Sequence, residues 1–255
     1  MVILAAGKVG GLIANRDYPF DFISENLSIQ VNVINAAHKY GIKKLIFFGS
    51  SCMYPKNSFK PMTEDQIFTG DLESSSIAYA TAKYSGVQMC QAINQQFDSS
   101  SFISVIPNSV YGPNDNFDLN SSHVLSALVR RIHEAKSNNL SSVTLWGTGT
   151  PRREFLYSDD LVNACILLLN SSLNFKNFPI NISEGADFSI IELSEKISKV
   201  IDYKGKIEWD PSKPDGAMKK LLDNSKMKSI GWRSKIDLNK GLELTYKWFL
   251  ENNAE

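Results

Sequence analysis

The segment Leu45-Ile46-Phe47-Phe48-Gly49-Ser50-Ser51-Cys52 sets the fold class, because an unbroken apolar run ends abruptly in small and polar residues. A short apolar run without alternation is typical of a strand that is buried on both faces of a parallel sheet. Such sheets bind ligands beyond the carboxyl ends of their strands. We therefore expect the two hydroxyls and the thiol of this segment to lie at a ligand site.

Strands and helices alternate on both sides of this segment. We expect strands at 2–6, 44–49, 102–106, 143–146 and 206–209, and helices at 20–40, 77–97, 123–135, 159–170, 189–201 and 238–251. Alternation at this spacing predicts βαβ units and a mostly parallel sheet. The predicted fold class is α/β, a Rossmann-like doubly wound parallel sheet followed by a smaller α+β part. Ser158 is the expected N-cap of the helix at 159–170.

The amino-terminal glycines are a poor match to a phosphate-binding loop. Gly7, Gly10 and Gly11 follow an apolar run, but Ile13 stands where a dinucleotide fingerprint needs its third glycine. Pro19 biases Tyr18 away from helix, so we expect the first helix to start only near residue 20.

The composition excludes several classes of partner. The chain has 255 residues, and Lys+Arg and Asp+Glu both total 27, so its charge does not suggest nucleic acid or a membrane surface. No segment is long and apolar enough to span a bilayer, and we expect no signal peptide. Three widely spaced cysteines favour a reducing, cytoplasmic environment. Without a C-x-x-C or His–Cys cluster, we expect no metal.

Tyr79 and Lys83 form a second candidate group, since residues four apart project from one face of a helix. An ammonium near a phenol lowers the pKa of the phenol, so the pair can exchange a proton with a substrate oxygen that Ser50 orients. A lone Y-x-x-x-K is a weak signal, because surface Tyr and Lys residues share this spacing by chance. The preceding strand and its Gly-Ser-Ser turn favour the catalytic interpretation.

Several longer motifs occur together in a fixed order. They are Ala5-Ala6-Gly7-Lys8-Val9-Gly10-Gly11, Gly49-Ser50-Ser51-Cys52-Met53-Tyr54-Pro55-Lys56, Tyr79-x-x-x-Lys83, Tyr111-Gly112-Pro113 with Asp115-Asn116-Phe117, Ser122-His123-Val124, Trp146-Gly147-Thr148-Gly149, Arg153-Glu154-Phe155 and Lys213-Pro214-Asp215-Gly216. In these motifs the chain resembles the GDP-L-fucose synthases, a family of extended short-chain dehydrogenases/reductases, over its whole length. The resemblance implies an NADPH-dependent enzyme that epimerises GDP-4-keto-6-deoxy-D-mannose at C3 and C5 and then reduces its C4 ketone, giving GDP-L-fucose.

The resemblance also implies catalytic roles. Cys52 is the base and His123 the acid of epimerisation; Tyr79 protonates the C4 oxygen, Ser50 hydrogen-bonds it, and Lys83 holds the cofactor ribose while tuning Tyr79. Thiol and imidazole groups suit proton transfer near neutral pH. Taken singly, Cys52 is equally explained as a small core residue, and His123 as a residue that caps a helix or lies on the surface.

Binding residues are carried over in the same way. The implied NADP(H) contacts are Gly49, Ser50, Ser51, Lys83, Pro107, Asn108, Ser109, Val110 and His123. The implied GDP-sugar contacts are Arg131, Trp146, Arg153 and Asp215. A guanidinium suits a diphosphate and an indole offers a flat face, although a solvated helix face would also explain Arg131 and core packing would explain Trp146. Asn108-Ser109 departs from the usual Thr-Asn of the family.

The family's first strand, Gly-x-x-Gly-x-x-Gly loop and first helices have no counterpart here. We therefore expect an incomplete NADP-binding domain at 1–165, an unpaired sheet edge, and a substrate-binding domain at 166–255 with contributions from about 117–140. The family commonly forms homodimers, for which the helices at 20–40 and 77–97 are candidates. Two alternatives stay open: a related nucleotide-sugar epimerase or dehydratase, and an inactive chain that retains a sugar-nucleotide site.

Overall fold

The computed structural model describes residues 1–56, 58, 60–97, 102–119, 121–171 and 179–252. Its first sheet is wholly parallel, as predicted. In spatial order its strands are β1 (Val2–Leu4), β2 (Leu45–Phe48), β3 (Phe102–Pro107) and β7 (Ile180–Ile182). In the described part of the chain β1 is an edge strand of this sheet.

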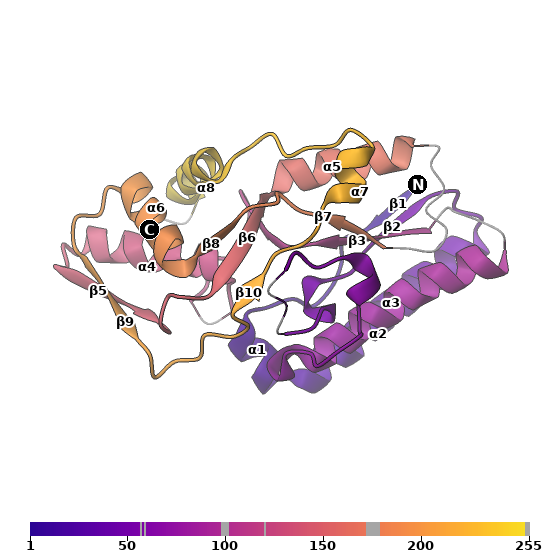
Figure 1. Cartoon of the computed structure of the whole chain (residues 1–255), viewed down its shortest axis with the longest axis horizontal. Helices are drawn as coiled ribbons and strands as arrows, with labels where there is room; N and C mark the ends of the chain where they lie inside the picture. Colours follow the sequence, from indigo (N-terminus) through magenta and orange to yellow (C-terminus); the bar gives the residue numbers. More distant parts are fainter. Residues whose placement is uncertain (57, 59, 98–101, 120, 172–178, 253–255) are drawn as a thin grey trace.

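Helices cover both faces of this sheet, which makes it doubly wound (Figure 1). They are α2 (Pro19–Lys39) and α3 (Ile77–Gln96) on one face, and α5 (Ser158–Asn170) and α7 (Ser225–Ser229) on the other. Leu45 and Phe47 belong to the core under α2 and α3, while Ile46 belongs to the core under α5 and α7. The apolar run of β2 is unbroken because successive side chains enter different cores.

A second group of elements surrounds its own core at the other end of the molecule (Figure 1). β6 (Arg152–Tyr157) pairs in parallel with β10 (Lys219–Lys220) and β4 (Ser109–Tyr111), and antiparallel with β8 (Asp187–Ser189). β5 (Ser142–Trp146) pairs with β9 (Lys206–Asp210). Helices α4 (Val124–Ser137), α6 (Ile190–Ile201) and α8 (Leu238–Asn252) pack over these strands.

Short helical turns complete the fold: α1 (Leu12–Asp17), η1 (Ser51–Met53), η2 (Glu64–Gln66) and η3 (Ser74–Ser76). Among the described residues, no helix combines the length and apolarity that crossing a bilayer requires.

Two local predictions are wrong. A helix, α1, does follow Gly11 at once, because Pro19 constrains only Tyr18, which leaves helical geometry (φ −124°, ψ 46°) and starts α2 with Pro19 at its first position. Ser158 is the first residue of α5 rather than its N-cap, which is Tyr157.

Five strands of the described structure were missed: β4, β6, β7, β8 and β10. β6 opens with Arg152 and Arg153 and so lacks an apolar run, and β7 is interrupted by the buried Asn181. The proposed domain boundary at residue 165 stays a prediction, and β7 shows that the chain beyond it supplies a strand to the first sheet.

Candidate active site

The turn after β2 is shaped by Gly49 and Ser50. A Cβ atom at Gly49 would clash with the side chain of Ile106, so glycine lets the chain leave the strand against β3. The Ser50 hydroxyl then accepts a hydrogen bond from the Cys52 amide at 3.2 Å and caps η1. The same side chain that is expected to orient a substrate oxygen therefore also fixes the turn that carries Cys52.

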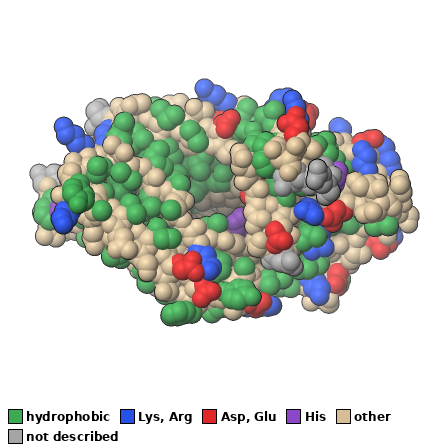
Figure 2. All heavy atoms as spheres, turned by 180° about the vertical axis from the view of Figure 1, so that it is seen from behind, with side chains coloured by type: hydrophobic (Ala, Val, Ile, Leu, Met, Phe, Trp, Pro, Cys, Tyr) green, Lys and Arg blue, Asp and Glu red, His purple; other side chains and the backbone are tan. Residues whose placement is uncertain are grey.

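A cavity of about 480 Å³ opens at this turn, and one face of the molecule is hollowed near its middle (Figure 2). The cavity brings together every predicted site residue except Lys83. They are Gly49, Ser50, Ser51, Cys52, Tyr79, Pro107, Asn108, Ser109, Val110, His123, Arg131, Trp146, Arg153 and Asp215. Residues far apart in sequence thus line one space, as the motif order predicted.

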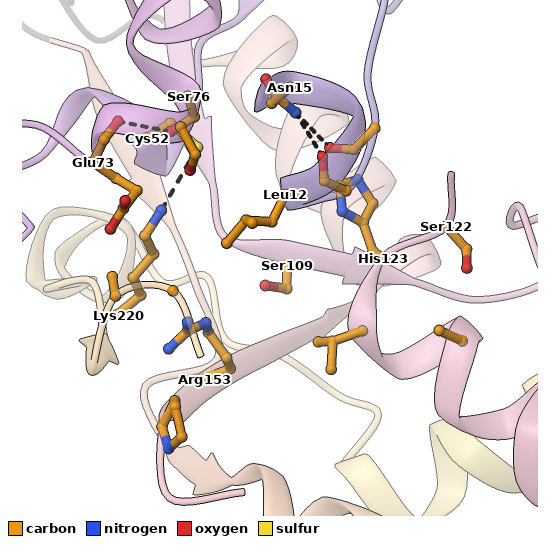
Figure 3. Close-up of a pocket in the computed structure, with 18 of the residues that line it drawn as sticks. Leu12, Asn15, Cys52, Glu73, Ser76, Ser109, Ser122, His123, Arg153 and Lys220 are labelled. Carbon is orange, nitrogen blue, oxygen red and sulfur yellow. Dashed lines mark hydrogen bonds between the residues drawn. The ribbon is translucent and has the colours of Figure 1, made fainter. Parts of the chain in front are cut away.

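Cys52 is half-buried, and its sulfur lies 3.6 Å from the Lys220 ammonium (Figure 3). Burial acts to raise the pKa of the thiol, but the charge of Lys220 and hydrogen bonds involving Ser50, Ser76 and Lys220 outweigh it and lower the pKa. The alternative of an inert core cysteine does not fit a sulfur with these partners.

Tyr79 behaves differently from the prediction. Burial, and after it the charge of Cys52, raise the pKa of the phenol, and a hydrogen bond with Ser50 opposes this only in part. The predicted lowering by Lys83 is wrong for this structure. The Lys83 ammonium lies 5.9 Å from the centroid of the Tyr79 ring and donates a hydrogen bond to the Phe48 carbonyl at 3.0 Å. Burial lowers the pKa of Lys83 to about 8.

His123 occupies the N-cap position of α4, but its side chain makes no capping hydrogen bond. His123 is exposed and lines the cavity. The surrounding cavity residues still desolvate the imidazole, and this desolvation lowers its pKa. Asp115 raises this pKa and Lys220 lowers it further. The His123 side chain therefore does not cap α4, and its ring is available for proton transfer.

Asn108 links the end of β3 to the second sheet. Its amide donates to a carboxylate oxygen of the buried Glu154 at 3.0 Å and to the Lys220 carbonyl at 3.3 Å. Its own Oδ1 is buried and has no protein partner. Because an orphaned acceptor in a cavity wall suits a ligand N–H, the residues at 107–110 fit a carboxamide such as that of nicotinamide.

The Gly7–Gly11 loop lines the cavity through Val9, Gly10 and Gly11, and it is also held by hydrogen bonds to protein groups. The Asn26 side chain accepts from the Lys8 amide and donates to the Lys8 carbonyl. The Gly11 amide donates to Ser121, and a Cβ atom at Gly11 would meet the Ser122 carbonyl. The Gly11 amide is therefore already hydrogen-bonded to a protein carbonyl.

The four residues expected to bind the GDP-sugar all line the cavity. The Arg131 guanidinium stacks on Trp146, 4.9 Å from its ring centroid, and Trp146 is 42% exposed, so neither a freely solvated Arg131 nor a core Trp146 fits. Asp215 accepts hydrogen bonds from the amide and the hydroxyl of Thr148, both at 2.8 Å. Its carboxylate therefore fixes the 147–150 turn beside Trp146.

Sequence reasoning missed several polar residues that line the cavity. They are Asn15, Glu73, Ser76, Ser122 and Lys220. Lys220 stands in register with Arg153 across β10 and β6, but nothing in the local pattern around it signals a strand.

A model of the NAD dependent epimerase/dehydratase family matches residues 1–183. The chain belongs to this family. It is 50% identical to a putative GDP-L-fucose synthase 2 of Arabidopsis thaliana over 98% of this chain and 76% of that relative. It is 46% identical to the GDP-L-fucose synthase of Escherichia coli K12, over 98% and 80%. These relatives confirm the resemblance to the GDP-L-fucose synthases.

A solved structure agrees. A GDP-L-fucose synthetase from Naegleria fowleri bound to NADP superposes with a TM-score of 0.84 at 28% identity, covering 92% of this chain and 74% of that one. The fold class predicted from the sequence, Rossmann-like α/β, is confirmed by this likeness and by the parallel sheet.

Proposed function

We propose that the chain is an NADPH-dependent epimerase-reductase that converts GDP-4-keto-6-deoxy-D-mannose to GDP-L-fucose. The observation that carries the proposal is the joint presence, in one cavity, of a thiol paired with an ammonium and of a Ser–Tyr hydroxyl pair. The first pair suits proton removal next to a ketone, and the second suits protonation of the ketone oxygen during reduction. High identity to named GDP-L-fucose synthases supports the substrate.

Epimerisation uses Cys52 and His123. The Cys52 thiolate takes the proton from the carbon next to the C4 ketone, and the C–H electron pair moves onto the ketone oxygen as an enolate. Ser50 and Tyr79 stabilise that oxygen by hydrogen bonds. His123 returns a proton to the other face of the carbon, which inverts it. Figure 3 supports this division of roles, because Cys52 and His123 approach the cavity from different walls.

Reduction follows at the same carbonyl. Tyr79 donates its proton to the C4 oxygen, while bound NADPH would supply the hydride to C4. The raised pKa of Tyr79 keeps the phenol protonated until the alkoxide forms, so it serves as the acid of this step. Lys83, whose ammonium lies 5.9 Å from the centroid of the Tyr79 ring, would hold the cofactor ribose, while the residues at 107–110 and Gly49–Ser51 would line the nicotinamide end.

Arg131, Trp146, Arg153 and Asp215 would bind the GDP-sugar. The stacked guanidinium and indole offer a flat, cationic surface for a nucleotide. Arg153 is directed into the cavity from β6 (Figure 3) and can meet a phosphate. Asp215 would act by holding the turn next to Trp146.

We further propose a cytoplasmic homodimer in which α2 and α3 meet their counterparts. Exposed apolar side chains on these helices support the interface, among them Phe20 at 75% and Ile77 at 53%. The division into an NADP-binding domain at 1–165 and a substrate-binding domain at 166–255, with a contribution from 117–140, is part of the same proposal.

The test is to incubate the purified chain with NADPH and the keto-sugar in D₂O and to analyse the product by NMR. The expected product is GDP-L-fucose carrying deuterium at C3 and C5, with one NADPH oxidised per product. Reduction of the keto-sugar without deuterium at C3 and C5 would indicate that the chain is a reductase without epimerase activity. Deuterium exchange without NADPH oxidation would favour a related nucleotide-sugar epimerase.

A further inference from the structure

Lys220 is anchored in its position by groups that are buried. β10 pairs in parallel with β6, which places Lys220 opposite Arg153. The Lys220 carbonyl accepts a hydrogen bond from the Asn108 amide. Two residues on, the Leu222 amide donates to the carboxylate of Glu154, a residue with no solvent exposure. These contacts fix the strand backbone, so the direction of the Lys220 side chain is set by the fold.

From this anchor the Lys220 side chain reaches across the cavity wall to the η1 turn. Its ammonium ends 3.6 Å from the Cys52 sulfur, a distance that suits a charge-assisted contact to sulfur. Figure 3 shows the two side chains directed toward one another, with Glu73 and Arg153 nearby. The contact joins positions 168 residues apart and brings the second sheet to the catalytic turn.

Other charged or titratable groups also surround the sulfur. Arg153 acts on it from β6 through its charge, and Tyr79 approaches from α3. Glu73, which precedes η3, acts on Arg153 and lines the same wall. Lys220 differs from these groups because its ammonium contacts the Cys52 sulfur directly. Removing the Lys220 charge therefore tests the ammonium–sulfur contact alone.

We propose that Lys220 is a positioning residue that holds Cys52 as a thiolate aimed into the cavity and thereby sets the pH range in which epimerisation runs. The proposal rests on the proposed function, because it assigns a partner to the base of that reaction. Since the same ammonium lowers the pKa of His123, it also makes the protonated imidazole a stronger acid. One cation thus favours both the deprotonated base and proton release from the acid.

The first test measures the thiol directly and needs no sugar substrate. Iodoacetamide alkylation of Cys52 is followed by peptide mass spectrometry between about pH 5.5 and 9.5 for the full chain, because only the thiolate reacts. In Lys220→Met we expect the midpoint to move to higher pH and the rate at pH 7 to fall about tenfold. Lys220→Arg, which keeps the charge, should stay near the wild-type profile.

Lys219→Met is the matched control. Lys219 is the neighbour of Lys220 on β10, but its ammonium pairs with Asp187 at 3.2 Å, so this variant removes a charge from the same strand away from the sulfur. Its alkylation profile should match the wild type. Circular dichroism and thermal midpoints identify any variant that is misfolded. A folded Lys220→Met with the wild-type profile overturns the proposal, as does an equal shift in Lys219→Met.

The second test separates this inference from the proposed function. The rate of deuterium exchange at C3 and C5 is measured against pH for the same variants. A matching shift of the exchange profile in Lys220→Met supports the link to epimerisation. If alkylation shifts while exchange does not, Lys220 still tunes the thiol, and the role of Cys52 as the base is what fails.

Discussion

Cys52, Tyr79 and Lys83 show that burial alone does not decide how a group titrates. Desolvation is the first cause of shift for all three groups. At Cys52 a contacting ammonium and hydrogen bonds outweigh desolvation and lower the pKa. At Tyr79 the hydrogen bond with Ser50 does not outweigh it, and at Lys83 burial is the cause of the shift. The uncharged forms of Tyr79 and Lys83 are therefore favoured relative to water, and the charged form of Cys52 is favoured.

Cys52→Ser tests the base. A serine hydroxyl is far less acidic than this thiol, so deuterium exchange at C3 and C5 should fall by about 10²-fold or more. The measurement is NMR of the keto-sugar in D₂O, with NADPH oxidation recorded in the same sample as the control for an intact reductase site. Exchange within a few-fold of the wild type would contradict the assignment.

Lys83→Met tests the buried ammonium through stability. Burial lowers the pKa of Lys83 from 10.5 to about 8, so between these values the unfolded chain binds more protons at Lys83 than the folded chain. Wild-type stability should therefore rise relative to Lys83→Met as pH rises from 8 to 10.5, by about 3 kcal/mol in total. Chemical denaturation without cofactor at both pH values measures this difference, and a pH-independent difference would contradict the shift.

Sequence spacing was a sound guide to proximity but not to the direction of the pKa of Tyr79. Tyr79 and Lys83 do lie on one helix near Ser50. The direction of this pKa shift depends on the groups that bury the phenol and on the charge at Cys52. Those groups lie on other elements, and the residue spacing within one helix does not tell where those elements pack.

At the scale of elements, the site depends on turns and short strands that are held by single side chains. The turn at 147–150 is tied to the loop before β10 by Asp215, which accepts hydrogen bonds from the amide and the hydroxyl of Thr148. Gly147 has φ +80° and the Asp215 carboxylate occupies the space of its missing Cβ, so this turn requires glycine.

Asp215→Ala should therefore raise KM for the GDP-sugar about tenfold while kcat changes little, because the turn loosens beside Trp146 rather than at the reacting carbon. Steady-state kinetics separate the two constants. Thr148→Val removes the hydroxyl's hydrogen bonds to Asp215 and Thr150 but keeps the bond from the Thr148 amide to Asp215, so it should show a smaller effect in the same direction. If Asp215→Ala lowers kcat instead, the carboxylate acts on the chemistry and not through the turn.

Strands with unbroken apolar runs were predicted closely from the sequence, whereas strands rich in charged residues were predicted only in part: β9 was expected, but β6 and β10 were not. β2 and β3 fill two cores and carry unbroken apolar residues, so their positions were predicted closely. β6 and β10 begin with or consist of charged residues and are strands only because neighbouring strands supply their hydrogen bonds. Lys220 was missed for this reason.

At the scale of the whole molecule, the cavity is walled by segments from both groups of elements, from Val9 to Lys220. A ligand that contacts both walls binds the folded chain but not the unfolded chain, in which the cavity does not exist. Such a ligand therefore stabilises the folded chain by mass action. The motif order predicted that these segments meet, but it contained no information on the distance between the walls.

GDP should therefore raise the thermal midpoint in a concentration-dependent manner, corresponding to about 2.7 kcal/mol at 100 times its dissociation constant. Differential scanning fluorimetry measures this shift. Trp146→Ala removes the exposed ring on which Arg131 stacks and should weaken the response, whereas Lys219→Met should preserve it. An undiminished response in Trp146→Ala would place the nucleotide elsewhere.

The contact between Lys220 and Cys52 also has a consequence for refolding kinetics. It closes a loop of most of the chain, and contacts of such long sequence separation form late because the entropy of closure must be overcome first. Helices and the β1–β2–β3 sheet can form before this closure, so far-ultraviolet circular dichroism should recover ahead of enzyme activity after dilution from denaturant. Thiolate reactivity at Cys52 would then report the last stage of folding.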